Sequence, residues 1–121
     1  MKDFEEVACL SYKNAKRLGY TDLSKEAIIE HLQGEIEELK VSRKAPDNII
    51  LKFLSCQEDD NKFMEIYEDR VKDSEVCELL DFIFVSLTRL FELGISINYA
   101  IRCKLRYNKL RSVKNDNKGT K

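Results

Sequence analysis

Residues that interrupt helices are scarce in this chain, and that scarcity limits its fold more than any other feature. Only 4 of the 121 residues are glycine and only 1 is proline. An all-β sandwich needs many turns, and turns depend on these residue types. The chain is instead rich in Glu, Lys and Leu, which favour helices. Because the length is also typical of a single domain, we predict one soluble, all-α domain.

The balance of charge and the lack of long apolar runs limit the partners of the chain. It carries 21 Lys and Arg against 22 Asp and Glu, whereas a general nucleic-acid-binding protein has a basic excess or a clustered basic face. The N-terminus MKDFEEVACL lacks the apolar segment of a signal peptide, and no run approaches the roughly 18 apolar residues of a membrane span. We therefore expect a cytoplasmic protein that binds neither nucleic acid nor membrane.

The cysteines favour the same compartment. They lie far apart in the sequence and form no C-x-x-C pair: Cys9, Cys56, Cys77 and Cys103. We expect reduced, mostly packed thiols, with a zinc site or a disulfide framework as the alternatives.

Helix signals in the first half of the chain predict two helices and an ambiguous segment. The first helix spans about 3–18 and is followed by Gly19, a residue suited to the C′ position. The second begins after an N-cap at Ser24 or Asp22 and continues to about Lys44, where an Ala-Pro pair breaks it. Residues 48–61 are interpreted as a short helix followed by a polar loop.

The second half of the chain predicts two more helices. A third helix extends from about residue 62 to Leu93, with a break near Asp73-Ser74 as the alternative. The fourth spans about 97–111 after an N-cap at Ser96. The last ten residues are polar, so we predict a domain at 1–111 and a disordered tail at 112–121.

Two pairs of acidic residues stand at helical spacing beside apolar stripes. Glu35 and Glu38 follow His31 along one border of the apolar face of the second helix, and Glu78 and Asp81 share a stripe of the third. Like charges at a core edge repel each other and lose solvation, and a hard divalent cation such as Mg²⁺ would relieve both effects. An ordinary solvated face is the alternative interpretation for each pair.

The fourth helix carries a complementary stripe. Lys104, Asn108 and Arg111 follow at i, i+4 and i+7, and guanidinium, ammonium and amide groups all bind phosphate oxygens. A basic last turn that is stabilised by the helix dipole is the alternative. Four acids for Mg²⁺ and a basic stripe for phosphate together indicate phosphoanhydride chemistry.

These motifs, taken in order, resemble a known family. The chain reads E-I-E-E-L from Glu35, E-L-L-D from Glu78, L-G-I from Leu93 and K-L-R-Y-N-K-L-R from Lys104. This order resembles the MazG-like all-α NTP pyrophosphohydrolases over roughly residues 28–111. The resemblance implies a four-to-five-helix bundle that assembles as an oligomer.

The resemblance also implies an activity and the residues that perform it. It implies Mg²⁺-dependent hydrolysis of a nucleoside or deoxynucleoside triphosphate to the monophosphate and pyrophosphate, with Mn²⁺ as a substitute ion. Residue by residue, it makes the acids the catalytic metal ligands and the basic stripe the substrate-binding group. The ligands are Glu35, Glu38, Glu78 and Asp81, and the substrate-binding residues are Lys104, Asn108 and Arg111.

The chain departs from the family pattern at three places. Glu38 and Glu78 are 40 positions apart, so residues 42–61 are interpreted as an insertion. Glu37 stands where a small residue is common, and Gly34 where some members have another acid. These departures leave the number of metal ions open.

Two other classes of function compete with the hydrolase. One is a catalytically inactive nucleotide-binding or helical interaction module of the same fold. The other is a di-iron carboxylate bundle, which needs two E-x-x-H pairs, whereas His31 is the only histidine of the chain. We interpret His31 as a structural residue.

The third helix further predicts a homo-oligomer, either a dimer or a dimer of dimers. Few polar residues interrupt its apolar run: Asp81, Ser86, Thr88 and Arg89. With Leu79, Phe82 and Val85 turned away from its main stripe, a monomer of four short helices would leave an apolar patch exposed. Cover by residues 48–61 of the same chain is the alternative.

Overall fold

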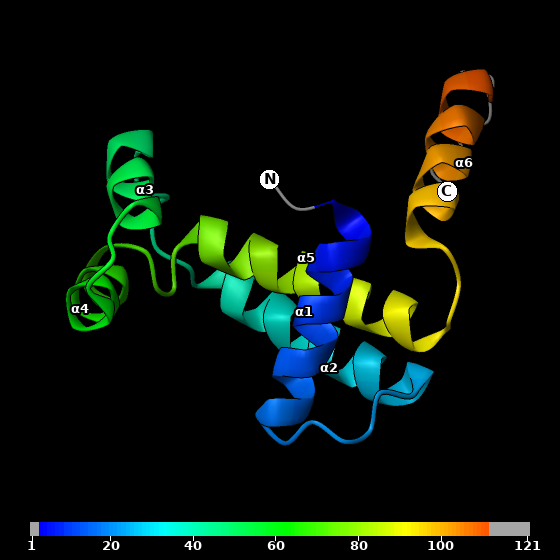
Figure 1. The fold of residues 1–121 in the computed structure, drawn as a ribbon, viewed down its shortest axis with the longest axis horizontal. Helices are drawn as coiled ribbons and strands as arrows, with labels where there is room; N and C mark the ends of the chain where they lie inside the picture. Colours follow the sequence, from blue (N-terminus) through cyan, green and yellow to red (C-terminus); the bar gives the residue numbers. More distant parts are fainter. Residues whose placement is uncertain (1–2, 112–121) are drawn as a thin grey trace.

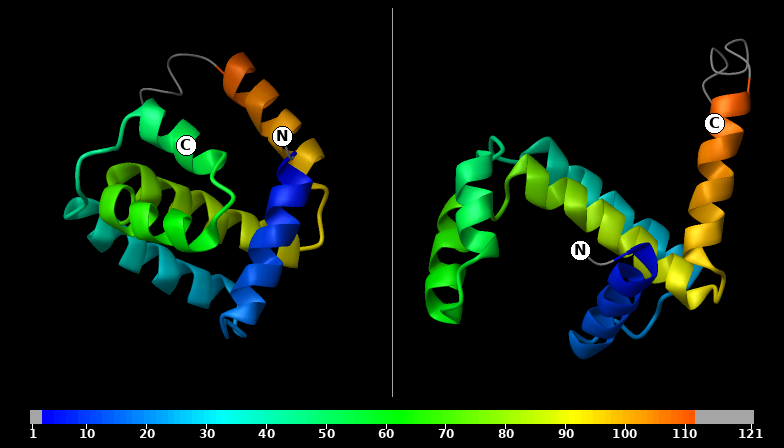
Figure 2. Two further views of the ribbon diagram at one scale, coloured as in Figure 1. Left: turned by 60° about the vertical axis from the view of Figure 1, so that its left-hand side comes forward. Right: turned by 45° about the horizontal axis from the view of Figure 1, so that its top comes forward.

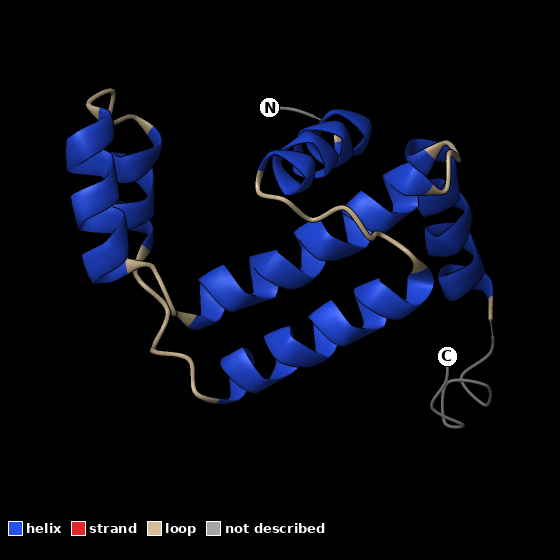
Figure 3. Ribbon diagram, turned by 90° about the horizontal axis from the view of Figure 1, so that it is seen from below, coloured by secondary structure: helices blue, strands red, loops and turns tan. Residues whose placement is uncertain are grey.

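The computed structural model describes residues 3–111, and this part of the chain contains helices, loops and one isolated β-bridge, without a β-strand (Figures 1 and 3). The prediction of an all-α fold is therefore confirmed for these residues. The helix count of six exceeds the four or five that we expected, and the predicted tail lies outside the described residues. The helices are α1 (Phe4–Arg17), α2 (Lys25–Lys40), α3 (Asn48–Ser55), α4 (Asp60–Arg70), α5 (Glu75–Glu92) and α6 (Ile97–Leu110).

Side-chain caps explain where these helices begin. Each helix starts after an Asp or Ser whose side chain accepts a hydrogen bond from a backbone N–H of the first turn. The predicted caps Ser24 and Ser96 are among them. Gly19 ends α1 as predicted, with φ +96°, and its N–H and that of Tyr20 donate to carbonyls of the last turn.

A contact between distant segments accounts for two boundaries that the sequence misplaced. The Arg43 N–H donates to the Asp73 carbonyl at 2.7 Å, and the Glu75 N–H donates to the Arg43 carbonyl at 2.9 Å. Because Arg43 is held in this bridge, α2 ends at Lys40 rather than near Lys44. Asp73 takes a positive φ of 64° and separates α4 from α5, so the broken alternative for the third helix is the observed one.

The centre of the fold is an antiparallel pair formed by α2 and α5, with α1 packed across α5 (Figures 1 and 3). Ala8, Leu87 and Ile97 are the buried centre of the core, and Val7, Leu90, Phe91 and Ile101 pack around them. α3 packs against α4, and this α3–α4 hairpin (residues 48–70) projects from one end of the α2–α5 pair. α6 projects from the other end (Figure 2).

The apolar faces of the long helices are only partly covered. Leu87 of α5 is buried, but Leu80, Ile83 and Phe84 are 39%, 47% and 40% exposed. Of the residues that we expected to form an exposed patch, Leu79 is 44% exposed, whereas Phe82 and Val85 are half-buried. The α3–α4 hairpin packs on itself and does not spread over α5, so it does not supply the internal cover considered above. Among the described residues, no helix is long and apolar enough to cross a membrane.

Candidate metal centre

The two predicted acid pairs meet between α2 and α5. Glu35 and Glu38 lie one turn apart on α2, and Glu78 and Asp81 lie one turn apart at the start of α5. One carboxylate oxygen from each of the four residues lies within 4.8 Å of all the others. Helical periodicity aligned each pair, and the antiparallel packing of α2 on α5 brought the two pairs together.

Two of these acids are buried without adequate partners. Glu78 is 3% exposed and Glu35 is 8% exposed, whereas Asp81 is half-buried and Glu38 faces solvent. In the described part of the chain, the Oε1 atoms of Glu35 and Glu78 have no hydrogen-bond partner. An ionised carboxylate out of water is strongly unfavourable unless a cation or several donors compensate it. The four acids themselves supply no positive charge that could compensate the buried carboxylates.

The raised pKa values of the acids also reflect this lack of compensating positive charge. Burial, followed by the charges of Asp81 and Glu38, raises the pKa of Glu35 to about 7. The same causes in the same order raise the pKa of Glu78 to about 7. Burial also raises the pKa of Asp81, and the charge of Glu38 adds to that effect. At neutral pH the cluster thus holds protons that a divalent cation would displace.

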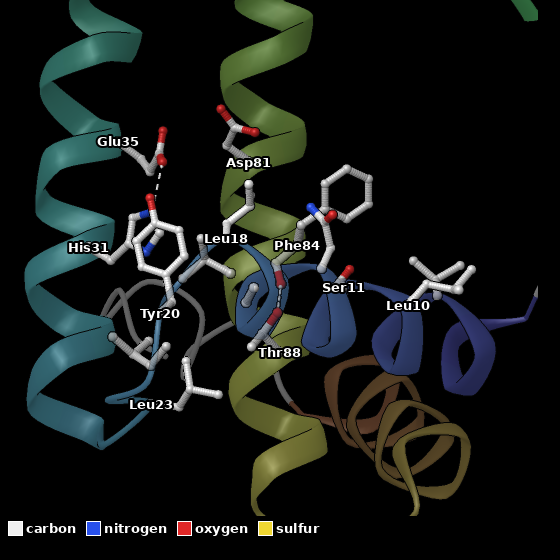
Figure 4. A pocket seen from close by; sticks show the side chains of 15 residues that line it. Leu10, Ser11, Leu18, Tyr20, Leu23, His31, Glu35, Asp81, Phe84 and Thr88 are labelled. Atoms are coloured by element: carbon white, nitrogen blue, oxygen red, sulfur yellow. Dashed lines mark hydrogen bonds and ion pairs between the residues drawn. The ribbon is translucent and has the colours of Figure 1, made fainter.

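His31 holds Glu35 from one side. Its Nε2 lies 3.2 Å from the Glu35 Oε2, one turn further along α2, and its ring stacks on Tyr20 at a centroid distance of 5.3 Å (Figure 4). This geometry agrees with the structural role that we predicted for His31, because the imidazole fixes the carboxylate rotamer. Tyr20, which comes from the loop after α1, was not predicted, and no sequence motif marks it.

A cavity of about 490 Å³ opens beside the acids, between α1, α2 and α5 (Figure 4). Glu35 and Asp81 form one end of its lining, and the remainder is mostly apolar. Its further lining includes Leu18, Leu23, Phe84, Ser11 and Asn14. The Asn14 Oδ1 accepts from the Arg17 guanidinium, which leaves the Asn14 amide N–H groups as donors toward a ligand. The cavity thus combines a mostly apolar lining with two carboxylates at one end.

Tyr67 is a second residue that the sequence did not indicate. It comes from α4, and its O–H donates to the Cys77 Sγ at 3.5 Å, next to Glu78 in the chain. Burial and the bond to Cys77 raise the pKa of Tyr67, so the phenol stays protonated at any physiological pH. The α3–α4 hairpin thus places a neutral hydroxyl at the edge of the acid cluster.

The four cysteines are free.

The predicted phosphate residues lie elsewhere in the same chain. Lys104 and Asn108 lie one turn apart on α6, which follows the end of α5 opposite the acid cluster (Figure 1). Arg111, which we expected on the same helix, is instead its C-cap residue with an extended backbone. Lys104 is exposed, and its Nζ lies 5.3 Å from the centroid of the Tyr107 ring. A single chain therefore brings the four acids together but does not bring the basic stripe to them.

Comparisons with protein-family models, with curated proteins and with solved structures found no match to this chain.

Proposed function

We propose that this protein is a Mg²⁺-dependent hydrolase that converts a nucleoside or deoxynucleoside triphosphate to the monophosphate and pyrophosphate. One observation carries the proposal: four carboxylates from two helices converge within 4.8 Å, and two of them are buried with unpartnered oxygens. The resemblance of the surrounding motifs to MazG-like pyrophosphohydrolases supports the reaction class.

The acid cluster fits Mg²⁺ or Mn²⁺ by its chemistry. All four ligand groups are carboxylates, which are hard donors, and no histidine nitrogen or cysteine sulfur belongs to the cluster. We assign Glu35, Glu38, Glu78 and Asp81 as the ligands. When bound, the ion would polarise phosphate oxygens and lower the pKa of a coordinated water.

The other residues of the site have roles in binding and orientation. His31 keeps the Glu35 carboxylate turned toward the cluster through the 3.2 Å contact. The half-buried Asp81 and the exposed Glu38 are the acids that a substrate can reach first, because Glu35 and Glu78 lie deeper. The apolar cavity next to Glu35 and Asp81 accepts the nucleoside, with Tyr20 and Phe84 as flat or apolar walls.

We further propose that the functional unit is a homodimer. The α3–α4 hairpin and α6 project from opposite ends of the α2–α5 pair, so neither covers the middle of α5 (Figures 1 and 2). The partly exposed Leu79, Leu80 and Ile83 of α5, which lie outside the cavity, form the apolar surface that a second copy would cover.

Product analysis tests the proposed reaction. The protein is incubated with a panel of nucleoside triphosphates, with Mg²⁺ or with EDTA, and the products are separated by chromatography. We expect monophosphate and pyrophosphate in equal amounts, and only when the ion is present. Glu38→Gln should abolish turnover, whereas Glu37→Gln on the neighbouring exposed position should not, since Glu37 pairs only with Lys40 among the described residues.

Two outcomes would contradict the proposal in different ways. Release of nucleoside diphosphate and inorganic phosphate would mean that the protein, with the same ion, cleaves a different phosphoanhydride bond. Binding of Mg²⁺ and nucleotide without any turnover would support the inactive nucleotide-binding module instead.

A further inference from the structure

We infer that two copies of this chain form an antiparallel, two-fold symmetric dimer, so that α6 of each copy lies against the α3–α4 hairpin of the other. The inference rests on the homodimer proposed above and adds its orientation and its contact surfaces. It does not depend on the chemistry of the acid cluster.

Both surfaces project from the body of the described part of the chain (Figure 2). α6 contacts α1 through its first turns, where Ile97 is buried and Ile101 is half-buried. Leu105 continues the same stripe one turn later but is 64% exposed. From Arg102 to Leu110 every residue of α6 is exposed, as the isolated position of this helix in Figures 1 and 2 illustrates.

The α3–α4 hairpin projects in the same way, but its base is rigid. The Arg43 guanidinium donates to the carbonyls of Asp69 and Lys72, which fixes the end of α4 to the body of the chain. The outer helix α3 keeps Ile49 78% exposed and Phe53 51% exposed. The hairpin is therefore a fixed surface rather than a loose insertion.

The two projections carry opposite charge. Between Ile97 and Arg111 there are five cations and no acid, and between Asp47 and Arg70 there are seven acids and three cations. In the described part of the chain, the four cations within α6 form no ion pair, and neither do the acids of α4. Each helix thus has a charge that its own chain leaves uncompensated.

The charges also form a strip along each of the two helices. Arg102, Arg106 and Lys109 lie within about 60° of one another around α6, and Glu65, Glu68 and Asp69 lie within about 100° around α4. All six are exposed. The predicted phosphate stripe lies on the opposite side of α6, so this contact leaves it available.

Two-fold symmetry leaves two ways to combine these surfaces. If the α2–α5 pairs of the two copies run in opposite directions, each α6 meets the hairpin of the other copy. If they run in the same direction, α6 meets α6 and hairpin meets hairpin, which opposes like charges. Because like-charge contacts select against an interface, the charge pattern favours the antiparallel arrangement, in which the α2–α5 pairs run in opposite directions.

Apolar groups beside the charges supply contact area. Ile49 and Phe53 line a hollow of about 560 Å³ on α3. On α6, Leu105, Tyr107 and Leu110 are 64%, 58% and 70% exposed. Burial of such side chains provides most of the affinity of an interface, whereas charged strips mainly fix its register.

Charge reversal tests the inference. Variant A carries Arg102→Glu and Arg106→Glu, variant B carries Glu65→Lys and Asp69→Lys, and variant C carries all four substitutions. We expect A and B each to weaken the dimer by on the order of tenfold or more in Kd, measured by analytical ultracentrifugation. C should recover the wild-type Kd, and an equimolar mixture of A and B should form heterodimers, because both contacts again join opposite charges.

The controls separate charge from folding. Lys13→Glu with Lys25→Glu reverses two exposed cations outside α6 and should leave the Kd unchanged. Circular dichroism checks that every variant keeps its helices, and recovery in C or in the mixture of A and B shows that each altered surface still functions. The inference is overturned if the wild-type chain stays monomeric, if A and B dimerise like the wild type, or if C fails to recover.

Discussion

Replacement of Glu78 by glutamine should stabilise the metal-free protein at neutral pH, although it removes one of the four proposed metal ligands. Glu78 is 3% exposed and its Oε1 has no hydrogen-bond partner among the described residues. Its pKa is raised by burial from 4.5 to about 7, so the folded state binds a proton more tightly than the unfolded state. A carboxyl group of this kind lowers stability as the pH rises from 4.5 to about 7, and the loss is complete above that range.

The size of the effect follows from the pKa. A shift from 4.5 to about 7 corresponds to about 3 kcal/mol of lost stability near pH 8. Part of this loss remains in the variant, because Glu35 stays buried beside the new amide, and because the amide needs partners of its own. We therefore expect Glu78→Gln to gain about 1–3 kcal/mol near pH 8, and the gain to shrink toward zero near pH 4.5.

Urea denaturation in EDTA, at several pH values between 4.5 and 8, measures this gain. Glu75→Gln is the matched control, since Glu75 lies on the same first turn of α5 but is exposed. Addition of Mg²⁺ or Mn²⁺ should stabilise the wild type and the control more than Glu78→Gln. The reasoning is refuted if Glu78→Gln is less stable than the wild type near pH 8 without metal, or if its advantage does not depend on pH.

Four further predictions follow from the site and the fold. Mg²⁺ affinity should rise with pH up to about 7, because the ion displaces protons from Glu35 and Glu78 when it binds. Calorimetry in two buffers of different ionisation enthalpy measures this proton release. A Mg²⁺ affinity that does not change with pH would contradict the prediction. Lys104→Ala and Asn108→Ala should weaken triphosphate binding more than Mg²⁺ binding in titration calorimetry, and an unchanged nucleotide affinity would return the stripe to an ordinary basic helix end. If the basic stripe of one copy serves the acids of the other, a mixture of Glu38→Gln and Lys104→Ala chains should recover part of the activity that each lacks, and a mixture as inactive as its components would exclude such sharing. Gly19→Ala should cost about 1 kcal/mol of stability, because alanine is strained at φ +96°, whereas Gly34→Ala within α2 should be neutral or stabilising in the same thermal melts.

Local geometry allowed the sequence to predict each half of the candidate metal centre, but not their meeting. Glu35 with Glu38 and Glu78 with Asp81 stand three residues apart, and a helix places such residues on one face whatever surrounds it. That the pairs converge within 4.8 Å depends on the antiparallel contact of α2 with α5. The burial of Glu35 and Glu78 in the same contact, rather than their spacing, raises their pKa values.

Residues that reach the site from a distance could not be predicted. Tyr67 lies beside the acids only because α4 folds back at Asp73, and Tyr20 only because the loop after α1 stacks it on His31. No periodicity or motif encodes such long-range placement. For the predicted basic stripe, the local spacing was predictable but its position was not. Lys104 and Asn108 lie one turn apart on α6, but α6 leads away from the acids of its own chain.

The sequence by itself determined the helical class and most helix starts, because caps such as Ser24 and Ser96 and the glycine after α1 act through hydrogen bonds within one turn. Only the tertiary structure decided where α2 ends, and it selected the break at Asp73-Ser74 that the sequence offered as an alternative. At both places the backbone of Arg43 pairs with Asp73 and Glu75, about thirty residues away. Helix propensity is worth only tenths of a kcal/mol per residue, so a few such hydrogen bonds between distant segments are enough to override it.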